Sequence, residues 1–268
     1  MSSSTDDYYE QACLYTDELA AKPYDLQRIR EATALIPSDV GSILDVGCGN
    51  GWFLNSLSDD IEKRGIDGSS EALKHVRCPT IQGDVGQLPL PDKSHDLVTC
   101  YEVIEHLNCG TFPLALSELS RVARKYIMVS VPNHENLKAA ARPCPQCHCR
   151  FHPARHVRSF TPDSLGGLFD GFETRTVQEI VPVAVAVHSL VLSSRFYRTL
   201  TGSEPLLPQA TCPQCHYRRP DPPRSNGSVA VNGQNHSGWR RLIAKPLQLL
   251  PKVRKAHWLI ALYVRGDD

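Results

Sequence analysis

The sequence lacks an apolar run long enough to cross a membrane. No stretch of about 18 apolar residues occurs among its 268 positions, and the most apolar segment, 181–192, is interrupted by Pro182 and His188. We therefore expect no membrane-spanning helix. The first residues also lack the basic and apolar regions of a secretory signal, so we expect a cytoplasmic protein.

The chain also lacks a net charge. Its 29 Lys and Arg residues balance 29 Asp and Glu residues, which excludes a uniformly basic protein that binds nucleic acid through charge alone. Apolar residues make up 41% of the chain, and 17 Gly and 20 Pro residues are no excess. This composition excludes collagen-like, coiled-coil and wholly disordered chains. The length predicts one large domain, or one domain with insertions.

Short apolar runs alternate with helical patterns along the first half of the chain. The runs predicted to be strands are 42–46, 65–67, 80–84, 96–100 and 126–131. Such alternation is typical of a parallel sheet with helices on both faces. Further strands are expected at 174–183 and 257–264, and Thr161 with Pro162 predicts the start of a helix.

A glycine-rich loop follows the first predicted strand. Gly47, Gly49 and Gly51 stand at alternate positions before a predicted helix at 52–57. Glycine lets the chain turn sharply and lets a ligand approach the backbone. The spacing differs from the G-x-G-x-x-G that binds a dinucleotide. Asp45, two residues before the first glycine, suits a ligand with an amine and a sulfonium better than a phosphate.

Two further acids follow the next predicted strands. Asp67 could accept hydrogen bonds from ribose hydroxyls, and Asp84 could accept one from the amine of adenine. Because the carboxyl ends of parallel strands share one edge of a sheet, we expect Asp45, Asp67 and Asp84 to line one crevice. The alternative interpretation is a plain turn with loop or helix-capping acids.

From about Ser42 to Val131 the sequence resembles the class I S-adenosylmethionine-dependent methyltransferases, in particular the ubiquinone/menaquinone-biosynthesis-like group of methyltransferase type 11. The resemblance rests on the segments Leu44-Asp45-Val46-Gly47-Cys48-Gly49, Gly83-Asp84-Val85, Asp96-Leu97-Val98 and Tyr101-Glu102-Val103-Ile104-Glu105-His106-Leu107. It implies an α/β fold, a Rossmann-like doubly wound sheet of seven strands whose last strand, 257–264, is antiparallel.

The resemblance also implies a binding site for S-adenosylmethionine. The loop 47–51 would contact the methionine part, Asp67 the ribose, Asp84 and Val85 the adenine, and the backbone of 100–102 would lie near the sulfonium. The candidate cofactor-binding residues are therefore Asp45, Gly47, Cys48, Gly49, Gly51, Asp67, Gly68, Asp84, Val85, Tyr101 and Glu102.

Candidate catalytic residues follow the fourth predicted strand. Methyl transfer requires alignment of the acceptor with the methyl group, and loss of a proton if the acceptor is a hydroxyl. The spacing of Glu102, Glu105 and His106 predicts that they lie near one face of a helical turn. His106 is the candidate general base, with Glu105 beside it. A capping or core-packed histidine is the alternative.

A cation site is a second interpretation of the same residues. Ubiquinone-pathway O-methyltransferases and small-RNA 2′-O-methyltransferases look similar here, and this resemblance implies a divalent cation held by Glu102, Glu105, His106 and His156. Such a cation would polarise hydroxyls of an acceptor. Similar motifs also occur in relatives without a metal, so both interpretations stay open.

Five of the ten cysteines are clustered around two copies of Cys-Pro-Gln-Cys-His. The C-x-x-C pairs Cys144 with Cys147 and Cys212 with Cys215 predict a closed four-cysteine site for structural zinc. Neighbouring residues could substitute as ligands: His148, Cys149, His152, His156 and His216. A redox pair or plain turns are the other interpretations.

Two stretches of the second half suggest surfaces rather than chemistry. Basic residues between Arg240 and Lys255 surround the apolar run 247–250 and could contact RNA or an anionic membrane, although a solvated face is the preferred interpretation. The apolar segment 184–192 is expected to pack over the acceptor pocket or to form a dimer contact.

The sequence therefore predicts a core interrupted by two insertions. The segments are an N-terminal helical part (1–40), a cofactor-binding core (41–135), a first cysteine insertion (136–160), a helix and strand of the core (161–183), a second cysteine insertion (184–250) and the C-terminal strand (251–268). The predicted function is transfer of a methyl group from S-adenosylmethionine to a small-molecule acceptor, with oxygen preferred. The alternatives are methylation of RNA, and a non-catalytic cofactor-binding or zinc-scaffold interaction protein.

Overall fold

The computed structural model describes residues 6–15, 23–180, 183–186, 210–218 and 252–266. The chain divides into two compact units. The first unit comprises Met1–Leu137, Arg155–Pro182 and Ala256–Asp268, and the second comprises Lys138–Ala154 and Val183–Lys255.

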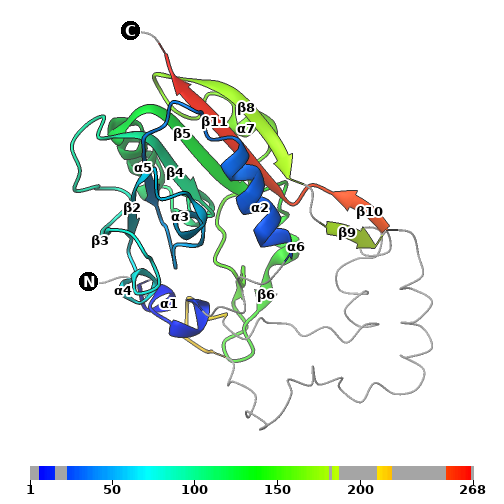
Figure 1. Ribbon diagram of the computed structural model, residues 1–268. Coiled ribbons are helices and arrows are strands. Elements are labelled where there is room, and N and C mark those ends of the chain that lie inside the picture. The colour runs from blue at the N-terminus through cyan, green and yellow to red at the C-terminus, as the bar shows by residue number, and fades with distance from the viewer. Residues whose placement is uncertain (1–5, 16–22, 181–182, 187–209, 219–251, 267–268) are drawn as a thin grey trace, which may run out of the picture. The chain divides into compact units, whose positions relative to one another are not determined.

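A seven-stranded sheet organises the first unit (Figure 1). Its strands are β1 (Ser42–Val46), β2 (Glu62–Asp67), β3 (Thr80–Gln82), β4 (His95–Tyr101), β5 (Ala123–Pro132), β8 (Phe172–Ile180) and β11 (Trp258–Arg265). They lie in the order β3-β2-β1-β4-β5-β11-β8. The pairs among β1 to β5 are parallel, whereas β11 runs antiparallel to both β5 and β8. The predicted Rossmann-like sheet with an antiparallel last strand is confirmed.

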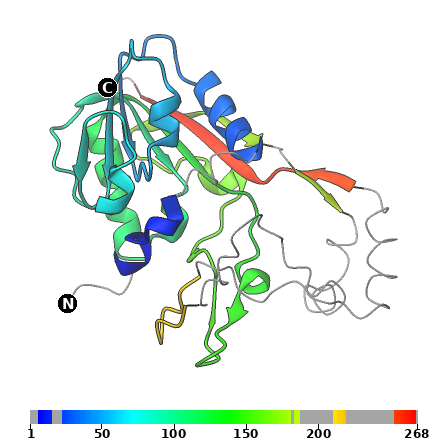
Figure 2. The same cartoon turned by 60° about the horizontal axis from the view of Figure 1, so that its bottom comes forward.

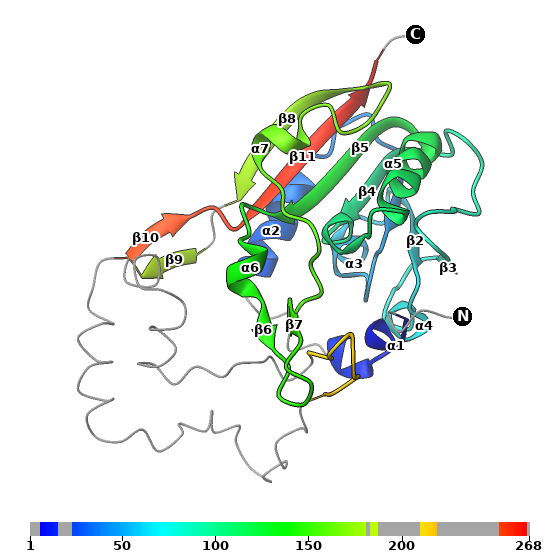
Figure 3. The same ribbon diagram turned by 180° about the vertical axis from the view of Figure 1, so that it is seen from behind.

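Helices cover both faces of this sheet because alternate strand residues point to opposite sides. Ile43 packs in a core cluster with Ala32 of α2 (Pro23–Ala34) and Leu54 of α3 (Trp52–Ser56). Leu44 packs in the other cluster with Leu119 of α5 (Thr111–Val122) and with α7 (Pro162–Leu165). Figure 1 looks onto the face covered by α2, and Figure 3 onto the face covered by α5.

Shorter elements complete the first unit. They are α1 (Asp6–Tyr9), the 3-10 turn η1 (Ala12–Tyr15), α4 (Ser70–Leu73) and the 3-10 turn η3 (Ile104–His106). The predicted start of α7 is confirmed, because the Thr161 hydroxyl accepts a hydrogen bond from Ser164 N and Pro162 occupies the first turn. Within the described ranges, no helix combines the length and the apolar character needed to cross a membrane.

The second unit contains short strands and a small core. Its described elements include α6 (Leu137–Ala140), β6 (Arg142–Pro143), β7 (Arg150–Phe151), β9 (Val183–Ala186) and β10 (Lys252–Lys255). β6 pairs with β7 and β9 pairs with β10, both antiparallel. The segment predicted as a strand at 174–183 is divided between β8 and β9. Most of the basic stretch and the segment 187–192 lie outside the described residues.

Packing around Gly65 leads to a test of the core. A Cβ atom at this position of β2 would lie 2.7 Å from Cys48 Sγ and 3.2 Å from Leu54 Cδ1. We expect Gly65→Ala to reduce the free energy of unfolding by about 1–3 kcal/mol, since overfilling a packed core forces its neighbours to shift. Thermal unfolding measures this loss. Gly41→Ala is the matched control, because its Cβ would stand 3.5 Å from Asp96 Oδ2, an ordinary contact. Equal melting temperatures of the two variants would refute the prediction.

Candidate functional site

The glycine loop between β1 and α3 makes a sharp turn at the carboxyl end of the sheet. Gly47, Gly49 and Gly51 all have positive φ angles, of 76°, 53° and 76°. A Cβ atom on Gly47 would lie 2.2 Å from Val103 Cγ2. Glycine is therefore required at Gly47 both for its backbone conformation and for its close approach to the segment after β4. The N–H groups of Gly47 and Cys48 both donate to Ile66 O, at 2.7 and 3.0 Å, which fixes the loop against β2.

The Asp67 carboxylate joins this loop to the next one. Its two oxygens accept hydrogen bonds from Gly49 N and from Ser69 N, both at 2.8 Å. Burial raises the pKa of Asp67, while the hydrogen bonds from Ser69 and Gly49 act in the opposite direction. The structure thus brings two of the predicted cofactor-binding residues, Gly49 and Asp67, into direct contact.

Asp45 lies deeper than the crevice predicted from the sequence. It is 3% exposed, and its Oδ1 accepts a hydrogen bond of 2.7 Å from the Thr99 hydroxyl. Burial raises the pKa of Asp45 to about 7, the Thr99 hydroxyl lowers it, and the Asp67 charge raises it further. A carboxylate in this position contributes negative potential to the sheet edge.

The third acid lies in a turn after β3. Asp84 is exposed, and its Oδ1 accepts a 2.7 Å hydrogen bond from Gly86 N. Val85 is partly buried and packs against the core cluster that contains Leu44. Gly68 follows β2, and its carbonyl accepts a 3.0 Å hydrogen bond from Gln82 Nε2.

Two further candidate cofactor-binding residues are Cys48, which is buried, and Tyr101, which is partly buried. The Cys48 side chain is 8% exposed, and burial raises the pKa of its thiol. The Tyr101 hydroxyl lies 3.1 Å from Met128 Sδ, and its ring meets Phe53 edge to face with centroids 4.8 Å apart.

The Glu102 carboxylate makes its hydrogen bonds with residues outside its own motif. The prediction of one helical turn containing Glu102, Glu105 and His106 is wrong, because Glu102 has a positive φ of 56° and only Ile104–His106 forms a 3-10 turn. The Glu102 carboxylate accepts hydrogen bonds from Trp258 Nε1 at 2.9 Å and from the Ser130 hydroxyl at 3.2 Å. A third contact, with Arg28 Nη1 at 3.2 Å, completes this polar cluster.

Glu105, His106 and His156 form a compact group of possible metal ligands. Their candidate ligand atoms all lie within 4.8 Å of one another. Glu105 has a fully buried side chain, and neither of its carboxylate oxygens has a hydrogen-bond partner. His106 Nε2 lies 3.8 Å from Glu105 Oε1, and the two imidazole rings meet edge to face at 4.7 Å. Burial, and then the Glu102 charge, raise the pKa of Glu105 well above its usual range. One oxygen and two nitrogen donors at this spacing fit a divalent cation.

No sequence pattern indicated that the N-terminal segment reaches this group. Tyr9 Oη lies 3.1 Å from His106 Nδ1, across 97 positions of sequence. Glu10 accepts hydrogen bonds from Ser70 N at 2.9 Å and Glu71 N at 3.1 Å, at the start of α4. Figure 2 shows this dark blue segment beside the cyan α4. The pattern of the first forty residues predicted helices there but no partner for them.

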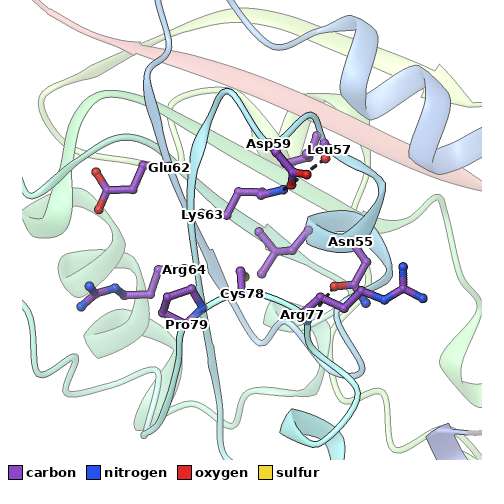
Figure 4. Close-up of a pocket in the computed structure, with 10 residues that line it drawn as sticks. Asn55, Leu57, Asp59, Glu62, Lys63, Arg64, Arg77, Cys78 and Pro79 are labelled. Carbon is purple, nitrogen blue, oxygen red and sulfur yellow. Dashed lines mark hydrogen bonds and ion pairs between the residues drawn. The ribbon is translucent and has the colours of Figure 1, made fainter.

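A separate hollow of about 550 Å³ lies at the other end of β2 (Figure 4). It is lined by Leu54, Asn55, Leu57, Asp59, Glu62, Lys63, Arg64, Arg77, Cys78 and Pro79. Lys63 Nζ contacts Asp59 Oδ1 at 2.7 Å and Leu57 O at 3.2 Å within it. None of the predicted site residues lines this hollow.

The two cysteine hairpins, 144–149 and 212–217, have the same backbone structure in the second unit. In each, the first cysteine N–H donates to the carbonyl five residues on, at 2.8 and 2.9 Å, and the histidine N–H donates back to the first cysteine at 3.0 Å. His148 and His216 both have positive φ angles, of 61° and 57°. Flanking residues pair equivalently, as Pro143 with Arg150 and Thr211 with Arg218.

The sulfur atoms of the two cysteine hairpins converge. Cys144 Sγ lies 3.6 Å from Cys215 Sγ, and Cys147 Sγ lies 3.6 Å from Cys212 Sγ. All four atoms are within 4.8 Å of one another. A tetrahedral zinc site with Zn–S bonds of about 2.3 Å has sulfur atoms about 3.8 Å apart, so the arrangement fits. Cys149 Sγ, 3.2 Å from Cys212 Sγ, lies at the edge of this cluster.

The sheet order, the glycine loop and the acids at the strand ends define the class I methyltransferase fold. Residues 44–126 match the family described as "Methyltransferase domain". A probable S-adenosylmethionine-dependent methyltransferase of Mycolicibacterium smegmatis is 37% identical over 101 residues, which cover 34% of this chain and 38% of that protein. A malonyl-[acyl-carrier protein] O-methyltransferase of Erwinia pyrifoliae is 34% identical over 95 residues, which cover 33% of this chain and 35% of that enzyme.

Solved structures share this fold. An S-adenosylmethionine-dependent methyltransferase of Archaeoglobus fulgidus has a TM-score of 0.53 and 17% identity, covering 94% of this chain and 98% of that one. A chain from a complex between a methyltransferase activator and a methyltransferase of Haloferax volcanii has a TM-score of 0.56 and 14% identity. The match covers 99% of this chain and 99% of that one. The protein therefore contains a class I S-adenosylmethionine-dependent methyltransferase domain, although the matched segment spans less than two fifths of the two curated relatives named above.

The buried Asp45 predicts a pH dependence of stability. Its pKa of about 7 in the folded protein exceeds the value of about 3.9 in an unfolded chain, so the folded state binds this proton more tightly. The contribution is complete below pH 4 and is lost as the pH rises through 7. We expect Asp45→Asn to reduce the fall in unfolding free energy between pH 5 and pH 7 by about 2 kcal/mol, as measured by urea unfolding of the cofactor-free protein. The exposed Asp60→Asn is the matched control and should keep the wild-type slope. An unchanged slope in Asp45→Asn would contradict the assignment.

Proposed function

We propose that the protein transfers the methyl group of S-adenosylmethionine to an oxygen atom of a small-molecule acceptor. One observation carries the choice of oxygen. The Glu105 carboxylate, in the turn after β4, is buried without a hydrogen-bond partner, and the side chains of His106 and His156 lie close to it. Glu105 and His106 come after the carboxyl end of β4, as the glycine loop comes after β1 and Asp67 ends β2. A cofactor would present its methyl group at this edge of the sheet.

The proposed cofactor-binding part of the site consists of the glycine loop and the acids that follow the neighbouring strands. Asp67 would accept hydrogen bonds from the ribose hydroxyls, in a position already fixed by Gly49 N and Ser69 N. Asp84 and Val85 would contact the adenine. Asp45 would act through its charge, since a buried carboxylate favours a positively charged sulfonium nearby.

The acceptor end would hold a divalent cation. Glu105, His106 and His156 are the residues that would bind it, and the cation would lower the pKa of an acceptor hydroxyl. A bare buried carboxylate is costly, and a bound cation removes that cost. Glu102, the fourth ligand expected from the sequence, instead binds Arg28 and Trp258, so its role would be to fix α2 against β11. The E. pyrifoliae relative is by name an O-methyltransferase, which also favours oxygen.

We also propose that the cysteine hairpins bind one structural zinc ion. Cys144, Cys147, Cys212 and Cys215 are the ligands, because their sulfur atoms converge and the hairpins that carry them are equivalent. A closed set of four thiolates leaves no position for a substrate, so this ion would stabilise the second unit rather than take part in transfer.

Cofactor binding tests the first proposal. We expect Asp67→Ala to weaken binding of S-adenosylmethionine at least about tenfold in calorimetry, because hydrogen bonds to a charged group contribute about 1.5–3 kcal/mol. His106→Ala should bind the cofactor within about twofold of wild type but lose transfer to a small catechol. The exposed Asp59→Ala is the matched control for the loss of a carboxylate.

Other outcomes would replace the proposal. If the wild-type protein binds no S-adenosylmethionine, the methyltransferase function is refuted. Transfer to RNA but to no small molecule would favour the RNA alternative, and binding without transfer to any component of a cell extract would favour a non-catalytic scaffold.

Metal analysis tests the zinc proposal. The purified wild-type chain should contain one zinc ion per molecule by mass spectrometry of its metals. Cys212→Ser should lose that ion, because Cys212 is buried in the cluster, whereas Cys109→Ser should keep it, because Cys109 is exposed and lies outside the cluster. Equal zinc contents in the two variants would exclude Cys212 as a ligand.

A further inference from the structure

We propose that Tyr9 and Glu135 are positioning residues that hold Nδ1 of His106 and of His156, so that both imidazoles present Nε2 to the same cation. The inference rests on the cation centre proposed above. Neither residue belongs to the motif after β4, and Tyr9 comes from the far end of the sequence. Together they would supply the outer contacts of a centre whose inner donors are Glu105, His106 and His156.

The first contact joins Tyr9 to His106. Tyr9 Oη lies 3.1 Å from His106 Nδ1, and the two rings meet edge to face with centroids 6.0 Å apart. His106 Nε2 is the nitrogen on the side of Glu105, at 3.8 Å from its Oε1. One nitrogen of this ring, Nδ1, therefore faces Tyr9, and the other, Nε2, faces the buried carboxylate of Glu105.

The second contact joins Glu135 to His156. Glu135 Oε2 makes a short hydrogen bond with His156 Nδ1, and both side chains are mostly buried. An ionised carboxylate only accepts hydrogen bonds, so Nδ1 must carry the proton. A histidine that donates from Nδ1 can coordinate a cation only through Nε2.

Both contacts match what a metal-binding histidine requires. Such a histidine donates its second N–H to a carboxylate, carbonyl or other acceptor, which fixes the ring and the tautomer. The Tyr9 hydroxyl is within hydrogen-bond distance of His106 Nδ1, and a phenol oxygen can accept a hydrogen bond from that nitrogen. In the tautomer with Nδ1 protonated, Nε2 is the nitrogen of each ring that can coordinate a cation.

Tyr9 is held in place by contacts on either side of it. The Tyr15 hydroxyl donates to Tyr9 O at 2.6 Å, and the neighbouring Glu10 caps the start of α4. The guanidinium of Arg155, one residue before His156, lies 5.0 Å over the ring of Tyr8. The N-terminal segment thus links the turn after Asp67 to the histidine pair, which makes Tyr9 a fixed support rather than a surface side chain.

Titration with Mn²⁺ in a calorimeter, in the presence of S-adenosylmethionine, tests the inference. We expect Tyr9→Phe and Glu135→Gln each to weaken Mn²⁺ binding about 10- to 100-fold, the loss typical of removing an outer contact of a metal-binding histidine. Tyr126→Phe and Glu173→Gln are matched controls outside the centre and should bind Mn²⁺ as wild type does. Thermal unfolding and cofactor affinity of each variant measure whether its fold is kept.

The outcomes separate this inference from the proposal beneath it. If the wild-type protein and Glu105→Ala both fail to bind Mn²⁺, the cation centre itself is refuted, and the positioning roles fall with it. If the wild type binds Mn²⁺ and Glu105→Ala does not, while Tyr9→Phe and Glu135→Gln bind it as tightly as wild type, only the positioning roles are refuted. If only one of the two variants binds Mn²⁺ as tightly as wild type, the positioning role of that residue alone is refuted.

Discussion

The Asp67 carboxylate connects two loops at the edge of the sheet where we propose that the cofactor binds. By accepting from Gly49 N and Ser69 N, it ties the loop after β1 to the turn after β2. The same carboxylate adds its charge to the buried Asp45, whose pKa is raised mainly by burial. Two acids with raised pKa values therefore lie behind the glycine loop. A cationic ligand lowers the cost of ionising both, which gives a physical reason for a sulfonium in place of a phosphate.

A second buried acid lies after the end of β4, where the side chain of Glu105 is shielded from water even more completely than that of Asp45. A chain with no net charge thus gathers several carboxyl groups at one edge of its sheet. Parallel strands make this concentration unavoidable once acids follow several of them, because their carboxyl ends meet. The polar cluster of Glu102, Arg28 and Trp258 shows the contrasting solution, in which an acid at the same edge is neutralised within the protein.

The elements that could be predicted from sequence are those set by local patterns. The buried runs at 42–46 and 96–100 became β1 and β4, and alternate glycines took the left-handed conformations that only glycine adopts easily. The orientation of Glu102 could not be predicted, because one residue with positive φ after β4 rotates its side chain out of the helical spacing assumed for the motif. Contacts such as Tyr9 with His106 depend on the tertiary path of the chain, which no local periodicity encodes. The convergence of the cysteine hairpins was predictable, because the C-x-x-C spacing of both pairs is typical of metal-binding cysteines.

The sheet order has a consequence for the order in which the protein can fold. β8 has β11 as its one neighbour in the seven-stranded sheet, and β11 also covers the outer edge of β5. During synthesis, β8 emerges long before β11, so the edge of β5 and the whole of β8 stay unpaired meanwhile. Exposed strand edges invite pairing with other chains. β11 therefore completes the sheet by pairing with β5 and β8 at the same time. Ribosome-bound chains that still lack β11 are the species that would most need a chaperone.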